Sequence, residues 1–143
     1  MNTNTTVTKT ILINAPAAKV WEALTNPDLM KQWMSEEEIE IDSNWEVGGS
    51  LVVRGKANGK YEYKGIILQI DPEKILRYTS WNKISRLPDL LENYSVIEFR
   101  LTPKENQIAL TLTHSNLIAE VAYEHSNFYW GSALYALKML VEK

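Results

Sequence analysis

The chain has 143 residues, 45% of them hydrophobic and 23% charged, which is the balance of one globular domain spanning residues 1–143. A net charge of −3 without a Lys/Arg cluster argues against a nucleic-acid or anionic-membrane partner. The absence of Cys excludes disulfides, thiolate metal sites and a cysteine nucleophile. No apolar run could span a membrane and the Thr-rich N-terminus is no signal peptide, so we expect a cytoplasmic protein.

The first third of the chain predicts one strand followed by two short helices. Residues 6–14 are rich in β-branched side chains, which favour a strand. Pro16 suits the first turn of a helix, and the Asn26-Pro27 pair ends that helix. A second short helix follows, with Trp33 and Met34 on its buried side.

The middle of the chain changes to a period of two. Residues 38–42 alternate strictly between charged and apolar side chains, which is typical of a half-buried strand. Asn58-Gly59 indicates a tight hairpin, and Gly65 suggests a bulge that changes which face points inward. Further antiparallel strands are predicted over 50–54, 61–70, 75–81, 94–102 and 107–115.

The last hairpin can be given a register. If Pro103 to Asn106 form the turn, Leu101 pairs with Ile108, and Ser95 pairs with His114. The large apolar residues then share one face, and a slip by one residue would destroy that match.

Residues 123–143 predict one long helix that is apolar on two sides. One stripe follows helical spacing and faces the core; its members are Trp130, Ala133, Leu134, Leu137, Leu140 and Val141. Phe128, Tyr135 and Met139 lie on the roughly opposite side. A helix of this kind is either deeply buried or borders something else that is apolar.

The fold expected from this order is α+β: a seven-stranded antiparallel sheet around a long C-terminal helix, with two short helices after the first strand. With these motifs, the chain resembles the helix-grip superfamily (START-related and birch-pollen-allergen-like, SRPBCC). Within it, the chain is similar to bacterial proteins that resemble the activator of the 90-kDa heat-shock protein ATPase. The matching motifs are Ile13-Asn14-Ala15-Pro16, Val20 to Pro27, Gln32-Trp33, Val47-Gly48-Gly49, Asp71-Pro72, Leu76 to Thr79, and Trp130 before Leu134. Ser50 departs from the pattern, because many relatives carry Arg there.

The resemblance implies an apolar cavity between the sheet and the long helix. Family members bind lipids, polyketides, flavonoids or hormones there, a few catalyse polyketide cyclisation or dehydration, and others contact a chaperone. We therefore expect binding of a small, largely apolar ligand. The alternatives are a cyclase-like or dehydratase-like enzyme, or a co-chaperone-like protein that uses an exposed apolar patch near Trp33 and Met34. A homodimer is compatible with each of these three functions.

The candidate ligand-binding residues are aromatic side chains that this fold would place around one cavity, with His114 as a polar anchor. The aromatic members are Trp45, Tyr63, Tyr78, Trp81, Tyr94, Tyr123 and Phe128. The competing interpretation is that these rings simply fill the core. The loop with Leu87, Leu90 and Leu91 is a candidate lid over the cavity mouth.

Catalysis and metal binding find little support in the sequence. His114 would be the acid/base of an enzyme, but a hydrogen-bonded histidine at a strand end explains it as well. It is far from His125, so the two histidines form no metal motif, and nucleotide-binding and nucleophile motifs are absent. We expect no cofactor. The residues do not decide whether the protein is an enzyme, and they favour a binding protein over a catalyst.

Overall fold

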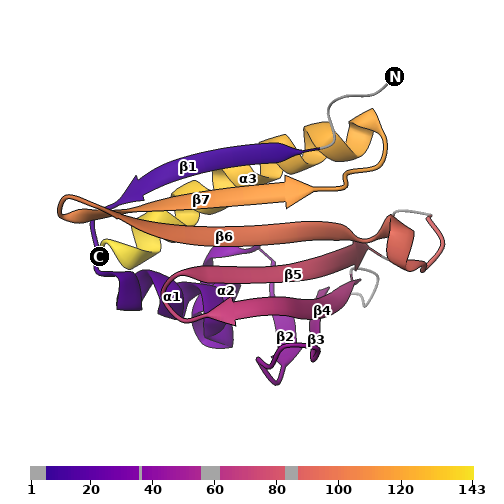
Figure 1. The fold of residues 1–143 in the computed structure, drawn as a ribbon, viewed down its shortest axis with the longest axis horizontal. Coiled ribbons are helices and arrows are strands. Elements are labelled where there is room, and N and C mark those ends of the chain that lie inside the picture. Colours follow the sequence, from indigo (N-terminus) through magenta and orange to yellow (C-terminus); the bar gives the residue numbers. More distant parts are fainter. Residues whose placement is uncertain (1–5, 36, 56–61, 83–86) are drawn as a thin grey trace.

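The computed structural model describes residues 6–35, 37–55, 62–82 and 87–143. Strand β1 is followed by two helices, six strands and one long helix (Figure 1). In chain order the elements are β1 (Val7–Ile13), α1 (Ala17–Thr25), α2 (Pro27–Trp33), β2 (Ile39–Ser43), β3 (Ser50–Gly55), β4 (Glu62–Asp71), β5 (Ile75–Asn82), the 3-10 turn η2 (Leu91–Asn93), β6 (Ser95–Lys104), β7 (Gln107–Ser115) and α3 (Glu120–Val141).

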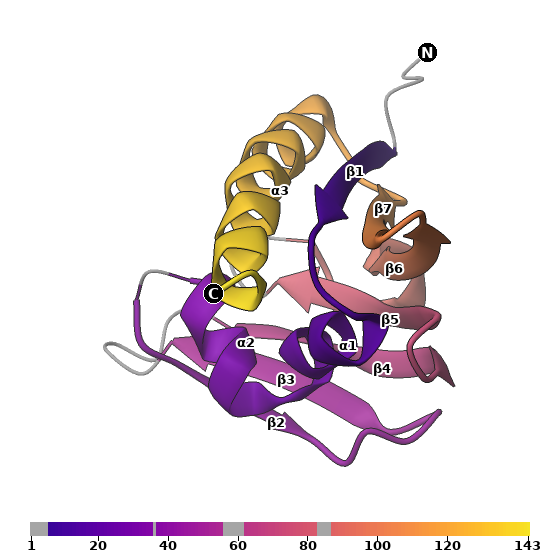
Figure 2. The ribbon, with the colours of Figure 1, turned by 90° about the vertical axis from the view of Figure 1, so that its left-hand side faces the viewer.

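The strands form one antiparallel sheet in the order β1-β7-β6-β5-β4-β3-β2. Strands β2 to β7 follow one another as neighbours, and β1 pairs beside β7 at the far edge. Figure 2 shows the curved sheet, with α3 and the short helices α1 and α2 on its inner side. The predicted α+β helix-grip architecture is confirmed.

The core lies between the inner face of the sheet and the three helices. The buried stripe of α3 includes Trp130, Leu134 and Leu137, as the periodicity predicts. Trp33 of α2 is only 4% exposed, and its indole N–H donates to the Ala23 carbonyl over 2.8 Å. Met34 is half-buried, so the exposed apolar patch expected near Trp33 and Met34 is wrong.

The β6–β7 hairpin closes more tightly than predicted. Lys104 pairs with Gln107, and Leu101 pairs with Leu110 rather than with Ile108. The turn is therefore Glu105-Asn106, and Glu105 has a positive φ of 57°. The predicted register is wrong by two residues. A shift of two leaves each side chain on its original face, so the apolar pattern could not reveal it.

Strand β4 contains the predicted irregularity, but at a different residue. The register shifts between Ile67 and Gln69, so the bulge lies at Leu68 rather than at Gly65. Gly65 serves another purpose, because a Cβ there would lie 1.8 Å from the Thr79 carbonyl oxygen of β5. Asn58-Gly59, the other predicted hairpin turn, lies outside the described residues.

Candidate functional site

His114, at the end of β7, is the centre of a polar cluster at the edge of the apolar interior, where His114 and Ser95 are half-buried and Ser126 and Trp130 are buried. Its Nε2 lies 2.8 Å from Ser95 Oγ of β6. Its Nδ1 lies 2.7 Å from Ser126 Oγ and 3.1 Å from the indole nitrogen of Trp130, both on α3. This cluster, the His114 cluster (Ser95, His114, Ser126 and Trp130), therefore joins the sheet to the N-terminal half of the long helix.

The hydrogen bonds fix the tautomer of His114. The Ser95 hydroxyl donates to the Ser80 carbonyl over 3.1 Å, so it accepts the proton of His114 Nε2. The indole N–H of Trp130 can only donate, so Nδ1 must be an acceptor. Both ends of the ring thus require the neutral form with hydrogen on Nε2. Burial, and secondarily the charge of His125, lower the pKa of His114 to about 4.

Aromatic rings fill the interior next to this cluster. The ring centre of Phe99 lies 5.6 Å from that of Trp130 and 6.5 Å from that of Tyr78. The His114 ring meets Trp130 edge-on at 6.2 Å. Of the predicted site residues, Tyr78 and His114 are therefore brought together here. Phe99 and Ser95 complete this region from β6.

Sequence reasoning missed Ser95, Ser126 and Trp130 as site residues. Part of the signal was present, because positions 126 and 130 are four apart and hence on one face of a helix. Ser95 was placed opposite His114 only through the wrong register, since His114 pairs with Ile97. Ser126 is the single buried polar residue among those described. Trp130 was assigned only to the core stripe because its indole N–H had no visible partner.

Three further predicted residues are half-buried around the interior. Trp45 and Tyr63 pack against the core from the side of β2 to β4, and Tyr123 lies in the first turns of α3. Burial raises the pKa of Tyr63, so its hydroxyl stays protonated. Tyr129, which the sequence did not single out, donates its hydroxyl to the Met34 carbonyl over 2.6 Å and links α3 to the end of α2.

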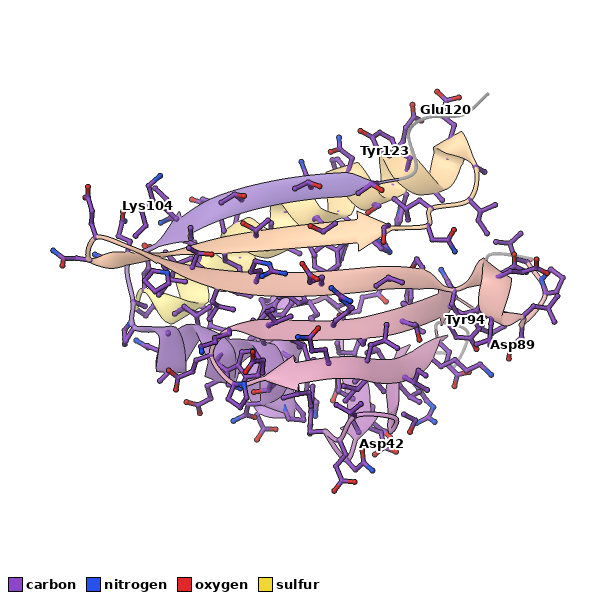
Figure 3. The ribbon with its side chains drawn as sticks, viewed as in Figure 1. Asp42, Asp89, Tyr94, Lys104, Glu120 and Tyr123 are labelled. Atoms are coloured by element: carbon purple, nitrogen blue, oxygen red, sulfur yellow. The ribbon has the colours of Figure 1, made fainter. Side chains whose placement is uncertain are left out.

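Trp81 and Tyr94 lie on the outer face of the sheet, which corrects their expected position at the interior. Their rings stack with centres 6.3 Å apart, and Lys64 Nζ sits 5.3 Å from the Trp81 ring centre. Asp89 accepts hydrogen bonds from Lys64 and the Tyr94 hydroxyl, which hold the pKa of Asp89 below its usual value. Figure 3 shows Asp89 and Tyr94 at one end of the sheet, apart from Tyr123 at the start of α3.

Two residues of the loop with Leu87, Leu90 and Leu91 also make contacts on the outer face of the sheet. Trp81 donates its indole N–H to the Leu87 carbonyl over 3.2 Å. Leu91 then borders an outer depression of about 230 Å³, whose other borders include Val52, Lys64, Ile66 and Thr79. Asn116, two residues after His114, also holds the loop by donating to the carbonyls of Glu92 and Tyr94. The contacts of Trp81 and Leu91 place part of the loop against the outer face, and its role as a lid stays a prediction.

Phe128 is also outside the interior. It is 78% exposed on the solvent side of α3, opposite the buried stripe. Of the eight predicted residues, Tyr78 and His114 face the interior, and Trp45, Tyr63 and Tyr123 are half-buried at its margin. Trp81, Tyr94 and Phe128 lie outside the interior. A ligand-binding role stays a prediction for all eight.

Two kinds of feature are absent from the described residues. No group of three or more His, Asp or Glu side chains lies close enough to hold a metal ion. Within the same residues, no helix has the length and apolar character needed to cross a membrane.

The curved sheet, the gripped C-terminal helix and the two short helices define a helix-grip protein. The chain belongs to the family of Activator of Hsp90 ATPase homolog 1-like proteins, whose family model matches residues 14–142. A search of curated proteins gives no match.

Solved structures share the whole fold. The protein ChR145 from Cytophaga hutchinsonii is 36% identical, with a TM-score of 0.82 over 99% of this chain and 97% of that one. The Aha1 dimer from Colwellia psychrerythraea is 24% identical, with a TM-score of 0.78 over 96% of each chain. DynU16, from the dynemicin biosynthetic locus, is 17% identical, with a TM-score of 0.78 over 96% of this chain and 47% of that one. The last two likenesses concern the fold alone.

Proposed function

We propose that this protein binds a small, largely apolar molecule between the sheet and the N-terminal half of α3, with the His114 cluster as its polar anchor. A lipid-, flavonoid- or polyketide-like molecule with one or two oxygen atoms suits this site. One observation carries the proposal: two donors, the Ser126 hydroxyl and the Trp130 indole, converge on the single lone pair of His114 Nδ1.

The convergence leaves one donor in surplus. A neutral imidazole nitrogen offers one lone pair, which one hydrogen bond satisfies. Either Ser126 or Trp130 can therefore turn to a carbonyl or phenolic oxygen of a ligand while the other keeps His114 satisfied. Buried polar groups in an apolar wall are the means by which pockets orient apolar ligands.

Space for the ligand must come from movement of side chains. Phe99, Tyr78 and Trp130 occupy the centre, while Tyr63, Tyr123 and Tyr129 are half-buried at the margin. The start of α3 lacks a side-chain cap, because Ala119 stands at its N-cap, with a φ of 79°. Outward movement of this end would separate Trp130 from Phe99.

The same geometry favours binding over catalysis. The three partners of His114 are two hydroxyl groups and an indole, and none of them is a carboxylate that would raise its basicity. A pKa of about 4 makes His114 a weak base at neutral pH. A cyclase or dehydratase role would need a stronger acid/base than this residue provides.

The test begins with native mass spectrometry of freshly purified protein to detect a co-purified molecule. Titration with 1-naphthol and naringenin, followed by NMR, should then shift the resonances of His114 and the Trp130 indole. Ser126→Ala should weaken binding about fivefold, since a hydrogen bond contributes about 1 kcal/mol. Thr113→Ala, on the neighbouring outward position of β7, is the matched control. Shifts confined to the outer depression near Leu91, or equal binding by Ser126→Ala, would reject the proposal.

We also propose that the protein self-associates. The Aha1 protein from Colwellia psychrerythraea, with the same fold, is a dimer, and α3 of the present chain carries apolar side chains on its solvent side. Sedimentation over a wide concentration range tests this second proposal independently of ligand binding.

A further inference from the structure

The solvent side of α3 carries a row of large apolar side chains. Val121 is 76% exposed, Phe128 78%, Tyr135 59% and Met139 39%. Figure 2 shows α3 with one side turned to the sheet and no helix or strand on its other side. Leaving such side chains in water forgoes the free energy that their burial would contribute, so their alignment requires an explanation.

Their spacing is that of a helix–helix contact. With His125 and Ser132, which are also exposed, the row steps by four, three, four, three and four residues from 121 to 139. This mean step of about 3.5 residues keeps a stripe straight along the face of a partner helix. We call this row the outer seam; it consists of Val121, His125, Phe128, Ser132, Tyr135 and Met139.

We infer that the outer seam binds the outer seam of a second copy, with the two α3 helices antiparallel about a two-fold axis beside position 130. This inference rests on the proposed self-association and specifies its surface. In this register the seam maps onto itself: Val121 faces Met139, His125 faces Tyr135, and Phe128 faces Ser132 of the second copy. A two-fold interface requires such self-complementarity.

Side-chain size agrees with the register. Phe128, the most exposed member of the seam, meets the small Ser132 of the second copy. Gly131 lies beside Ser132, and the space around its Cα is open. The ring of Phe128 therefore enters a gap between large residues, as a knob enters a hole. A parallel pairing would instead place Phe128 against Phe128 and Ser132 against Ser132.

Charge also favours the antiparallel arrangement. The exposed Glu120 and Glu124 lie at the start of α3, and the exposed Lys143 follows its end. The end of α3 also carries Lys138 and Glu142, which form an ion pair, so Lys143 is its surplus positive charge. Antiparallel helices bring the two glutamates of each copy to this end of the other and oppose the two helix dipoles. Parallel helices would align the four glutamates with one another.

The size of the seam predicts a weak dimer. Since an aromatic side chain can bury about 150–250 Å², the exposed parts of the four large side chains amount to roughly 500 Å² per copy. A total of about 1,000 Å² lies at the lower end of specific interfaces. We therefore expect dissociation at micromolar concentrations, with monomer and dimer in equilibrium.

Sedimentation velocity of the full chain provides the first test. The wild-type sedimentation coefficient should rise with concentration between about 1 µM and 1 mM, the range in which weak interfaces associate. Phe128→Glu should remain monomeric throughout. Leu91→Glu, which changes an equally exposed apolar residue on the outer sheet face, should associate like the wild type. If the wild type stays monomeric, or if Leu91→Glu is the variant that loses association, the inference is overturned.

Cysteine cross-linking tests the register, and the natural chain contributes no Cys. His125→Cys and Tyr135→Cys proteins should form a disulfide dimer when mixed and oxidised. Neither should cross-link alone, because like positions are ten residues or roughly 15 Å apart along the antiparallel helices. Association without the mixed cross-link would overturn this surface while leaving self-association itself intact.

Discussion

Trp130 donates its indole N–H to Nδ1 of His114 across 3.1 Å, from the long helix to the last strand. Because the indole can only donate, this contact is lost when Nδ1 is protonated, and two N–H groups would then face each other. The contact therefore stabilises the packed interior only while His114 is neutral. Protonation of one side chain is coupled to the attachment of α3.

This coupling predicts that the protein loses stability on mild acidification. The pKa of His114 lies at about 4 in the folded chain and near 6.5 when unfolded, so the unfolded chain binds the proton first. The stabilisation is complete above about pH 6.5 and falls as the pH drops towards 4, by about 3 kcal/mol in total. Urea unfolding between pH 4 and 7.5 measures this loss of stability. In His114→Gln, this part of the pH dependence should disappear, and an unchanged slope would contradict the assignment.

Replacing Trp130 separates the effect of its indole N–H on the pKa of His114 from the effect of burial on that pKa. In Trp130→Phe the ring stays apolar but the donor is gone, so the pKa of His114 should rise towards its ordinary value. Titration of the imidazole carbon-bound protons by NMR gives this pKa directly, and a His125→Gln background leaves one histidine signal to follow. If the pKa stays at about 4, burial alone sets it and the indole contributes nothing.

The sequence predicted the elements of this fold better than their pairing. Alternation over 38–42 and the stripe through Leu134 and Leu137 depend on local periodicity, and both elements appear where expected. The β6–β7 register failed because Leu101 meets an inward apolar partner at either Leu110 or Ile108. Only the turn conformation at Glu105 distinguishes the two registers, and neither Glu105 nor Asn106, the two turn residues, is a Gly or Pro.

The site was predicted only in part, for a different physical reason. His114 was found from its inward phase on β7, and Tyr78 from the same phase on β5. Trp81 was misplaced because aromatic character was taken as a sign of the interior, whereas its alternation with Tyr78 directs it outward. Its stacking on Tyr94 and its contact with Lys64 join separate strands and a loop, and nothing in local sequence indicates them.

The two apolar sides of α3 should respond differently to truncation. Leu137 is fully buried, so Leu137→Ala should lower the free energy of unfolding by about 2–5 kcal/mol through lost burial and the cavity left behind. Met139→Ala, two residues further on but on the outer seam, should change it by less than about 0.5 kcal/mol at concentrations where the protein is monomeric. Urea unfolding at about 1 µM, below the dissociation range expected for a weak interface, makes the comparison. Equal losses would mean that the seam is part of the monomer core.

Replacing Gly65 and Gly131 by Ala should change the stability of the fold in opposite directions. A Cβ at Gly65 would lie 1.8 Å from the Thr79 carbonyl oxygen, a backbone atom that moves only if β4 and β5 separate. Gly65→Ala should therefore destabilise the protein by more than about 3 kcal/mol or prevent folding, since it combines a clash with loss of strand pairing. A Cβ at Gly131 meets no atom within 4 Å, and the residue lies at an exposed position inside α3. Gly131→Ala should stabilise the fold by about 1 kcal/mol, the difference in helix propensity. Urea unfolding of both variants measures the contrast, and a tolerated Gly65→Ala would mean that β4 and β5 approach less closely than the structure shows.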